Sequence, residues 1–177
     1  EYMGVDQMLF REDRKGAEIK GGRISEKYVA DSIISEFNEK KKGQPEFYMV
    51  LTAQAHMPFN YDKYESYDIE IESSPYSQAV NQTLISYAQG TYDADAQLGR
   101  LYEYINTLDE PTLLVFYGDH LPFLKTEGGE DATEVLSYFN TGSPSLDAYR
   151  RYNTQCLLLS NFPMEQESRY LSPDLIM

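Results

Sequence analysis

Cysteine, long apolar runs and positive charge are all scarce in this sequence. The single cysteine, Cys156, leaves no disulfide partner within the chain and excludes a zinc or iron–sulfur site built from several cysteines. No apolar run approaches the ~20 residues that cross a bilayer. Lysine and arginine number 15 against 29 aspartates and glutamates, a net charge of −14. Such a surface repels phosphate backbones and anionic lipid heads, which argues against a nucleic-acid partner.

Core-forming material is plentiful by contrast. Hydrophobic residues make up 41% of the 177 residues and include 16 tyrosines and 8 phenylalanines, which excludes a disordered acidic chain. The length suits one domain, so we treat 1–177 as a single segment. Its first six residues carry neither a signal-peptide pattern nor an initiator methionine, and we interpret the chain as part of a longer protein. Residues 1–23 are polar and glycine-containing, and we expect an irregular lead-in there.

Two segments have the apolar spacing of helices. The first runs over residues 25–40, with Ser25 as its cap and lysines followed by Gly43 at its end. The second covers residues 80–108 in steps of three and four, with a kink expected at Gly90. A coiled coil is the alternative for this second segment, but Thr91 and Ala94 would make a thin seam.

Three short, dense apolar runs are typical of strands buried on both faces: residues 47–52, 112–117 and 154–160. A surface loop is expected over 57–75, two short helices over 131–139 and 145–152, and a further helix after Ser172. Strands that alternate with helices predict an α/β fold with a mostly parallel sheet flanked by helices.

Both histidines follow predicted strands directly. His56 comes after the run at 47–52, and His120 after the run at 112–117. In open α/β sheets, ligands bind beyond the carboxyl ends of the strands, so both imidazoles lie where such folds keep their chemistry. Asp119 and His120 are adjacent after Gly118, and mixed oxygen and nitrogen ligation suits Mn²⁺, Zn²⁺ or Mg²⁺. The alternative is a turn capped by Asp119, with His120 beside it.

A complete catalytic set is not evident from the residues alone. The hydroxyl groups of Thr52, Ser73, Ser74 and Ser160 stand beside no recognisable activating base. Nucleophile-elbow, phosphate-loop and His-Glu-x-x-His motifs are all missing. Cys156 lies in a predicted buried strand, where an inert thiol is expected.

Several motifs together resemble one family. The run Val50 to Phe59 resembles the strand, polar turn and His-x-Pro-Phe motif of lipoteichoic acid synthase-like phosphoglycerol transferases, which belong to the alkaline phosphatase/sulfatase superfamily. Residues 92–99 resemble that family's Tyr…Asp-x-x-Leu-Gly helix, and Leu114 to Pro122 resembles its Tyr-Gly-Asp-His strand end. Residues 152–161 resemble the late strand that follows. The order and spacing of these motifs match across most of the chain.

The resemblance implies roles for three residues. Asp119 and His120 correspond to two metal ligands of the family, and His56 to a histidine that contacts the phosphoglycerol or phosphate group. It also implies that the threonine nucleophile, a glutamate ligand and a substrate-gripping arginine lie upstream, outside this chain. The chain would then be the C-terminal part of a catalytic domain with a partial alkaline phosphatase/sulfatase-like fold, and no catalytic nucleophile would lie within it.

The same resemblance describes the parent protein. It would be a membrane-anchored enzyme on the extracellular face of a bacterial membrane, using Mn²⁺ or Mg²⁺, with Zn²⁺ or Ca²⁺ as alternatives. Its substrate would be a phospholipid head group or a polyol phosphate, or in sulfatase relatives a sulfate ester. These 177 residues alone would be soluble and inactive. The alternative function is a non-catalytic, acidic binding module that uses the tyrosines of the 57–75 loop and Tyr76, although packing of those tyrosines onto the domain is the interpretation we favour.

Overall fold

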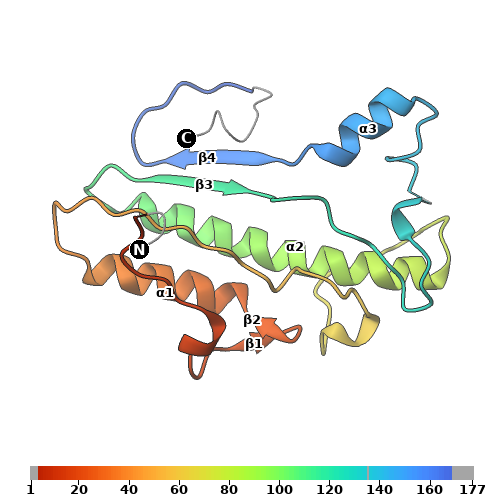
Figure 1. The fold of residues 1–177 in the computed structure, drawn as a ribbon, viewed down its shortest axis with the longest axis horizontal. Coiled ribbons are helices and arrows are strands. Elements are labelled where there is room, and N and C mark those ends of the chain that lie inside the picture. Colours follow the sequence, from red (N-terminus) through yellow and green to blue (C-terminus); the bar gives the residue numbers. More distant parts are fainter. Residues whose placement is uncertain (1–3, 135, 169–177) are drawn as a thin grey trace.

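The computed structural model describes residues 4–134 and 136–168 (Figure 1). Two long helices lie against each other, and a pair of strands lies along the second helix. The elements in chain order are η1 (Arg11–Asp13), β1 (Ile19–Lys20), β2 (Arg23–Ile24), α1 (Glu26–Glu39), η2 (Tyr61–Lys63), α2 (Gln78–Ile105), β3 (Leu113–Tyr117), η3 (Ala132–Glu134), α3 (Pro144–Tyr152) and β4 (Cys156–Ser160).

Both long helices form where the apolar spacing predicted them. The Ser25 hydroxyl accepts a hydrogen bond from the backbone N–H of Tyr28 and caps α1 at 3.0 Å. Ser77 caps α2 in the same way through the N–H of Val80. Helix α2 continues without interruption through Gly90, so a helix break is not the role of that glycine.

The C-terminal end of α2 is tied to the strand pair by one side chain. The amide nitrogen of Asn161 donates to the carbonyls of Ile105 and Leu108 at 3.0 Å each, and to that of Glu110 at 2.9 Å. Its side-chain oxygen accepts from the N–H of Thr112 at 2.7 Å. Ile105 is the last residue of α2, and Leu108 and Glu110 follow it, so Asn161 joins the helix end and the segment after it to the strand pair.

The lead-in is less irregular than predicted. Residues 19–24 form a β-hairpin with a two-residue loop, in which Lys20 lies opposite Arg23. Gly21 and Gly22 make the turn with φ values of +61° and +74°, which the favoured two-residue hairpin turn requires of both central residues. Two consecutive glycines were the sequence signal for this turn.

The predicted parallel pairing is wrong for the strands described. β3 and β4 pair antiparallel, with Val115 opposite Leu158, and the hairpin pair is antiparallel too. Dense apolar runs indicate burial, but they carry no information on strand direction. Here residues 118–155, which contain α3, bring the chain back beside β3 in the opposite sense (Figure 1).

Burial of the three apolar runs also differs from the prediction. Residues 47–52 pair with no other strand among the described residues and have no regular secondary structure. The ends of β3 are exposed, with Leu113 at 48% and Tyr117 at 53%. Cys156 opens β4 in a half-buried position instead of a buried one.

The remaining predictions have mixed outcomes. The loop over 57–75 is confirmed and contains only the short turn η2, and α3 confirms the helix predicted over 145–152. Residues 131–134 and 136–139 do not form the predicted helix: they contain an isolated bridge at Asp131, η3 and turns. The helix expected after Ser172 lies outside the described residues. Within the described part of the chain, no helix is both long and apolar enough to cross a membrane.

The hydrophobic core lies directly behind the two histidine-bearing segments. Its buried members are Phe59, Val80, Leu124 and Ala132. Phe59 follows His56 by three residues and Leu124 follows His120 by four. Both segments are therefore anchored by apolar side chains that α2 helps to bury.

Candidate functional site

The two histidines have the same local geometry. His56 Nδ1 donates a hydrogen bond to the carbonyl of Met57 at 3.1 Å, and His120 Nδ1 donates to that of Leu121 at 2.8 Å. A carbonyl can only accept, so in each ring Nδ1 carries a proton. In the neutral form of each ring, Nε2 is then the nitrogen with a lone pair that can bind a metal ion.

Asp119 and His120 lie close enough to share one ion. Asp119 Oδ2 and His120 Nε2 are 3.6 Å apart, and both side chains are mostly exposed. Two ligands that each lie about 2.1 Å from one ion are about 3.0–3.4 Å apart at bond angles of 90–109°. The observed separation is slightly longer, so a small rotation of these exposed side chains would place both atoms on one ion. The other carboxylate oxygen of Asp119 accepts the N–H of His120 at 2.9 Å. Asp119 thus caps the turn, as the alternative prediction had it, and still presents a second oxygen.

These two ligands do not complete a metal site within the described residues. Residues 4–134 and 136–168 contain no cluster of three or more histidines, cysteines, aspartates and glutamates placed to hold an ion. A hydrolytic metal needs further ligands. The chemistry of Asp119 and His120 fits part of a mixed oxygen and nitrogen set.

A repeated motif links the two histidines, and our sequence analysis overlooked it. His56-Met57-Pro58-Phe59 and His120-Leu121-Pro122-Phe123 both have the pattern histidine, apolar residue, proline, phenylalanine. The sequence signal for this repeat is the shared proline and phenylalanine at the second and third positions after each histidine.

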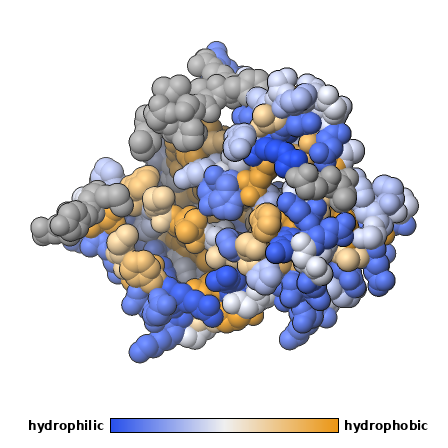
Figure 2. All heavy atoms as spheres, turned by 45° about the vertical axis from the view of Figure 1, so that its right-hand side comes forward, coloured by the Kyte–Doolittle hydropathy of each residue, from blue (hydrophilic) through white to orange (hydrophobic). Residues whose placement is uncertain are grey.

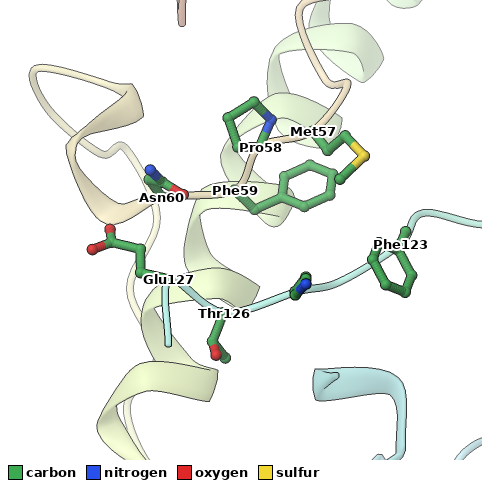
Figure 3. A pocket seen from close by; sticks show the side chains of 8 residues that line it. Met57, Pro58, Phe59, Asn60, Phe123, Thr126 and Glu127 are labelled. Carbon is green, nitrogen blue, oxygen red and sulfur yellow. The ribbon is translucent and has the colours of Figure 1, made fainter. Parts of the chain in front are cut away.

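The segments after the two histidines converge on one pocket of about 360 Å³. Met57 to Asn60 form one wall, and Phe123, Lys125, Thr126 and Glu127 face them across the opening (Figure 3). Glu127 bridges the walls, since its carboxylate accepts from the backbone N–H of Tyr61 at 3.3 Å. His56, Asp119 and His120 do not line this pocket themselves; the residues that follow each histidine do.

The turn that carries His56 is fixed by the buried amide of Gln54. Its side-chain oxygen accepts from the N–H of Glu26, the first residue of α1, at 2.8 Å. Its nitrogen donates to Asp93 on α2. Asp93 also accepts from Gln89 at 3.0 Å and pairs with Lys20 at 2.7 Å. Because Gln54 and Gln89 are at most 1% exposed, these bonds form in a shielded environment where they strengthen one another.

The polar face of α2 explains why this network was not foreseen. In the middle of the helix the buried residues are Thr83, Ser86, Gln89 and Gly90 rather than apolar ones. An added Cβ at Gly90 would lie 2.9 Å from the Cα of Ala55, so the glycine lets the His56 turn approach the helix backbone.

Two titratable groups beside the turn have shifted pKa values. Burial raises the pKa of Glu26 above its ordinary 4.5, although hydrogen bonds from Thr52, Gln54 and Ala55 oppose the shift. Burial, aided by the nearby charge of Arg23, lowers the pKa of Lys63 to about 8. The Lys63 ammonium donates to the carbonyl of His56 at 2.5 Å, so it also holds the turn in place.

The tyrosines of the 57–75 loop pack on one another. Tyr61 and Tyr67 stack with centroids 5.2 Å apart, and Tyr64, which the binding-module hypothesis needs exposed, is only 5% exposed. The Tyr64 ring meets Tyr67 edge-on. These contacts match the loop-packing interpretation.

Comparisons with known proteins agree with one another. The model of the Sulfatase family matches residues 4–156. The "Putative cyclic beta-1,2-glucan modification protein" of Rhizobium meliloti (strain 1021) is 31% identical over 123 residues, which make up 70% of this chain and 19% of that protein. The structure of Streptococcus pyogenes phosphoglycerol transferase GacH in complex with sn-glycerol-1-phosphate matches with a TM-score of 0.64 and 28% identity, and covers 86% of this chain and 35% of that one. The chain thus spans about a fifth and about a third of these two relatives.

Proposed function

We propose, since the chain belongs to the sulfatase family, that it supplies the metal-binding aspartate and histidine and a substrate-contacting histidine to a phosphoglycerol transferase-like enzyme. The chain is a lipoteichoic acid synthase-like member of the alkaline phosphatase/sulfatase superfamily, as its motifs predicted, and its fold class is that of the superfamily. In this proposal it forms the C-terminal part of the catalytic domain, and the threonine nucleophile and glutamate ligand come from the rest of the parent protein.

The observation that carries the proposal is the shared orientation of the two imidazoles. Both Nδ1–H groups are held by the next residue's carbonyl, which leaves both Nε2 atoms available. Asp119 Oδ2 lies beside Nε2 of His120. Each histidine is followed directly by a segment that lines the same pocket, which favours a shared functional site over a purely structural role.

The residues of this chain would act by binding and by proton positioning. Asp119 and His120 would hold Mn²⁺ or Mg²⁺, with Zn²⁺ or Ca²⁺ as alternatives, and an ion there neutralises negative charge on the transferred group. His56 Nε2 would hydrogen-bond the phosphoryl group or serve the leaving oxygen. The Gln54 network and Lys63 would keep that imidazole in position.

The substrate class is part of the proposal. GacH, a phosphoglycerol transferase, is known in complex with sn-glycerol-1-phosphate, which favours a polyol phosphate or phospholipid head group here too. The parent would act at the extracellular face of a bacterial membrane. With a net charge of −14, the chain would rely on the bound cation to attract such anions.

The test is made in the full-length parent protein. Asp119→Asn and His120→Ala should abolish bound metal and lower phosphodiester cleavage by about 10²–10⁴-fold, whereas His56→Ala should lower kcat with the metal retained. Glu103→Gln, which changes an exposed carboxylate on α2 outside the family motifs, is the control and should change neither readout.

Two results would refute the proposal. One is full activity in the Asp119 and His120 variants, which the non-catalytic binding module requires. The other is phosphodiester cleavage by the isolated 177 residues, because the nucleophile is proposed to lie outside them.

A further inference from the structure

The loop that follows His56 forms a second pocket, of about 510 Å³, against the side of α2. Its lining comes from the loop between residues 61 and 70 and from Ile85 on the helix. In Figure 1 this loop is the yellow segment beneath the right-hand part of α2. Figure 2 turns that side of the molecule forward, where hydrophobic patches interrupt a largely hydrophilic surface. The pocket has the size of small-molecule sites, which occupy roughly 300–1,000 Å³.

Tyr61 supplies a flat aromatic surface in this pocket. Its ring stacks on that of Tyr67, at a centroid distance of 5.2 Å and an interplanar angle of 9°. Tyr67 is itself held in place, because its hydroxyl donates to the carbonyl of Tyr61 at 2.7 Å and its ring meets the buried Tyr64 edge-on. Tyr61 is nevertheless 47% exposed. Packing of the loop therefore fixes the orientation of the Tyr61 ring and still leaves part of it open to a ligand.

Three carboxylates line the pocket with the tyrosines: those of Asp62, Glu65 and Glu70. All three residues are exposed, and none of these side chains forms a hydrogen bond or an ion pair with another described residue. An ionised carboxylate only accepts hydrogen bonds, so hydroxyl and other donor groups are its natural partners. Anionic ligands would be repelled, since Lys63, the only cation of the 57–75 loop, is engaged with the carbonyl of His56.

This combination fits a neutral saccharide better than a small organic cation. One face of a sugar ring carries C–H groups, which pack on the negative π face of a tyrosine, and its edges carry hydroxyl groups that carboxylates can accept. Organic cations are instead typically enclosed by several aromatic faces. Here Tyr61 and Tyr67 cover one face of each other, and the Tyr64 ring already has Lys20 and Lys63 at 5.8 Å and 5.4 Å from its centroid.

We infer that the pocket between residues 61 and 70 and Ile85 binds a neutral saccharide chain, with the Tyr61 ring as the stacking surface and the three carboxylates as acceptors of sugar hydroxyl groups. The inference goes beyond the proposed function, because neither the metal ligands nor His56 line this pocket. Asn60 lines the pocket beside the histidine segments and Tyr61 lines this one, so a bound chain would lie next to the candidate site.

The experiment titrates the full-length parent protein with three neutral glucose pentasaccharides, namely laminaripentaose, cellopentaose and maltopentaose, and follows binding by calorimetry. At least one should bind, and Tyr61→Ala should weaken that binding about tenfold, because the stacking surface is lost. Tyr61→Phe keeps the ring and should bind within about twofold of the unchanged protein. The matched control is Tyr102→Ala, which removes a tyrosine of α2 that is 40% exposed and lies outside the pocket, and it should leave binding unchanged.

A second set of measurements separates a saccharide from a cationic ligand. Glu65→Gln and Glu70→Gln each keep an acceptor oxygen and remove a charge, so each should weaken pentasaccharide binding by less than about threefold. Added salt should leave that binding nearly unchanged, since a neutral ligand is not attracted by charge. Pentalysine serves as the cationic probe, and its binding to the same surface would depend strongly on both the charge and the salt.

The inference is overturned if none of the three pentasaccharides binds, if Tyr61→Ala binds as tightly as the unchanged protein, or if pentalysine alone binds. The variant His120→Ala separates the inference from the proposed function. It should bind the pentasaccharide normally, and loss of saccharide binding in this variant would show that the pocket is no independent site and would overturn the inference. If the pentasaccharide binds as expected but the parent shows no dependence on Asp119 and His120, the saccharide pocket stands and the proposed function fails.

Discussion

Helix α2 contains two interior glycines whose replacement by alanine should have different effects. Gly99 is exposed, and a Cβ added there meets no atom within 4 Å. Gly90 is buried, and its added Cβ would lie 2.9 Å from the Cα of Ala55 and 3.0 Å from the hydroxyl oxygen of Tyr64. Gly90 therefore marks the place where the His56 turn contacts the helix.

The magnitude follows from two contributions. Alanine is favoured over glycine inside a helix by about 1 kcal/mol, and this gain applies to both sites. Overpacking a tight contact costs about 1–3 kcal/mol, and this cost applies only at Gly90, where the neighbouring backbone must move. We therefore expect Gly99→Ala to raise the free energy of unfolding. The free energy of unfolding of Gly90→Ala should be about 1–3 kcal/mol lower than that of Gly99→Ala. For a chain of this size, that difference corresponds to roughly 2–12 °C in Tm.

Urea unfolding followed by circular dichroism measures this difference, and the imidazole C–H signals of His56 in the NMR spectrum report the local effect. The His56 signals should shift in Gly90→Ala and stay in place in Gly99→Ala. If Gly90→Ala stabilises the chain as much as Gly99→Ala and leaves those signals unchanged, the close contact between α2 and the His56 turn does not exist.

Three further predictions concern side chains that join segments distant in sequence. Burial raises the pKa of Glu26 above 4.5, so the folded chain keeps a proton that the unfolded chain has lost, and the free energy of unfolding falls as pH rises through that window. Glu26→Gln should remove this fall in a series of urea titrations upward from about pH 4.5. Burial lowers the pKa of Lys63 to about 8 from 10.5, so between these values the unfolded chain binds more protons and stability rises with pH. Lys63→Met should abolish that rise, and an unchanged slope between pH 8 and 10 would contradict the assignment. Asn161→Asp keeps the shape of the side chain but removes its donors to the carbonyls of Ile105, Leu108 and Glu110, and it should lower the free energy of unfolding by about 1–3 kcal/mol. Asn153→Asp, which loses one exposed bond to Tyr149, should cost less in the same titration.

The helices could be predicted because their signals are local. The apolar spacing of α1 and the hydroxyl of Ser25 lie within one segment, and no distant residue is needed to interpret them. The positions of His56 and His120 after apolar runs were equally local, so the sequence was enough to single them out as candidate site residues. Their assignment as substrate and metal ligands stays a prediction.

The strand partners could not be predicted because they depend on other segments. The run 47–52 has the composition of a buried strand, but burial needs a partner surface that the described residues do not provide to Phe47 or Met49. The polar network was missed for a related reason. Gln89 resembles a solvent-facing helix residue, and only its bonds to Asp68, 21 residues away, reveal that it is buried.

Through the hydrogen bonds of Gln54, the relative position of α1 and α2 affects the position of the His56 turn. One end of its amide is fixed to the start of α1 and the other to Asp93 of α2. Apolar contacts would let the helices slide by small amounts, whereas these bonds tolerate only a few tenths of an ångström. A shift of α1 along α2, for example after loss of the Asp31–Arg100 ion pair, would therefore be transmitted to the His56 turn. Residues between the helices can thus influence the imidazole without touching any ligand.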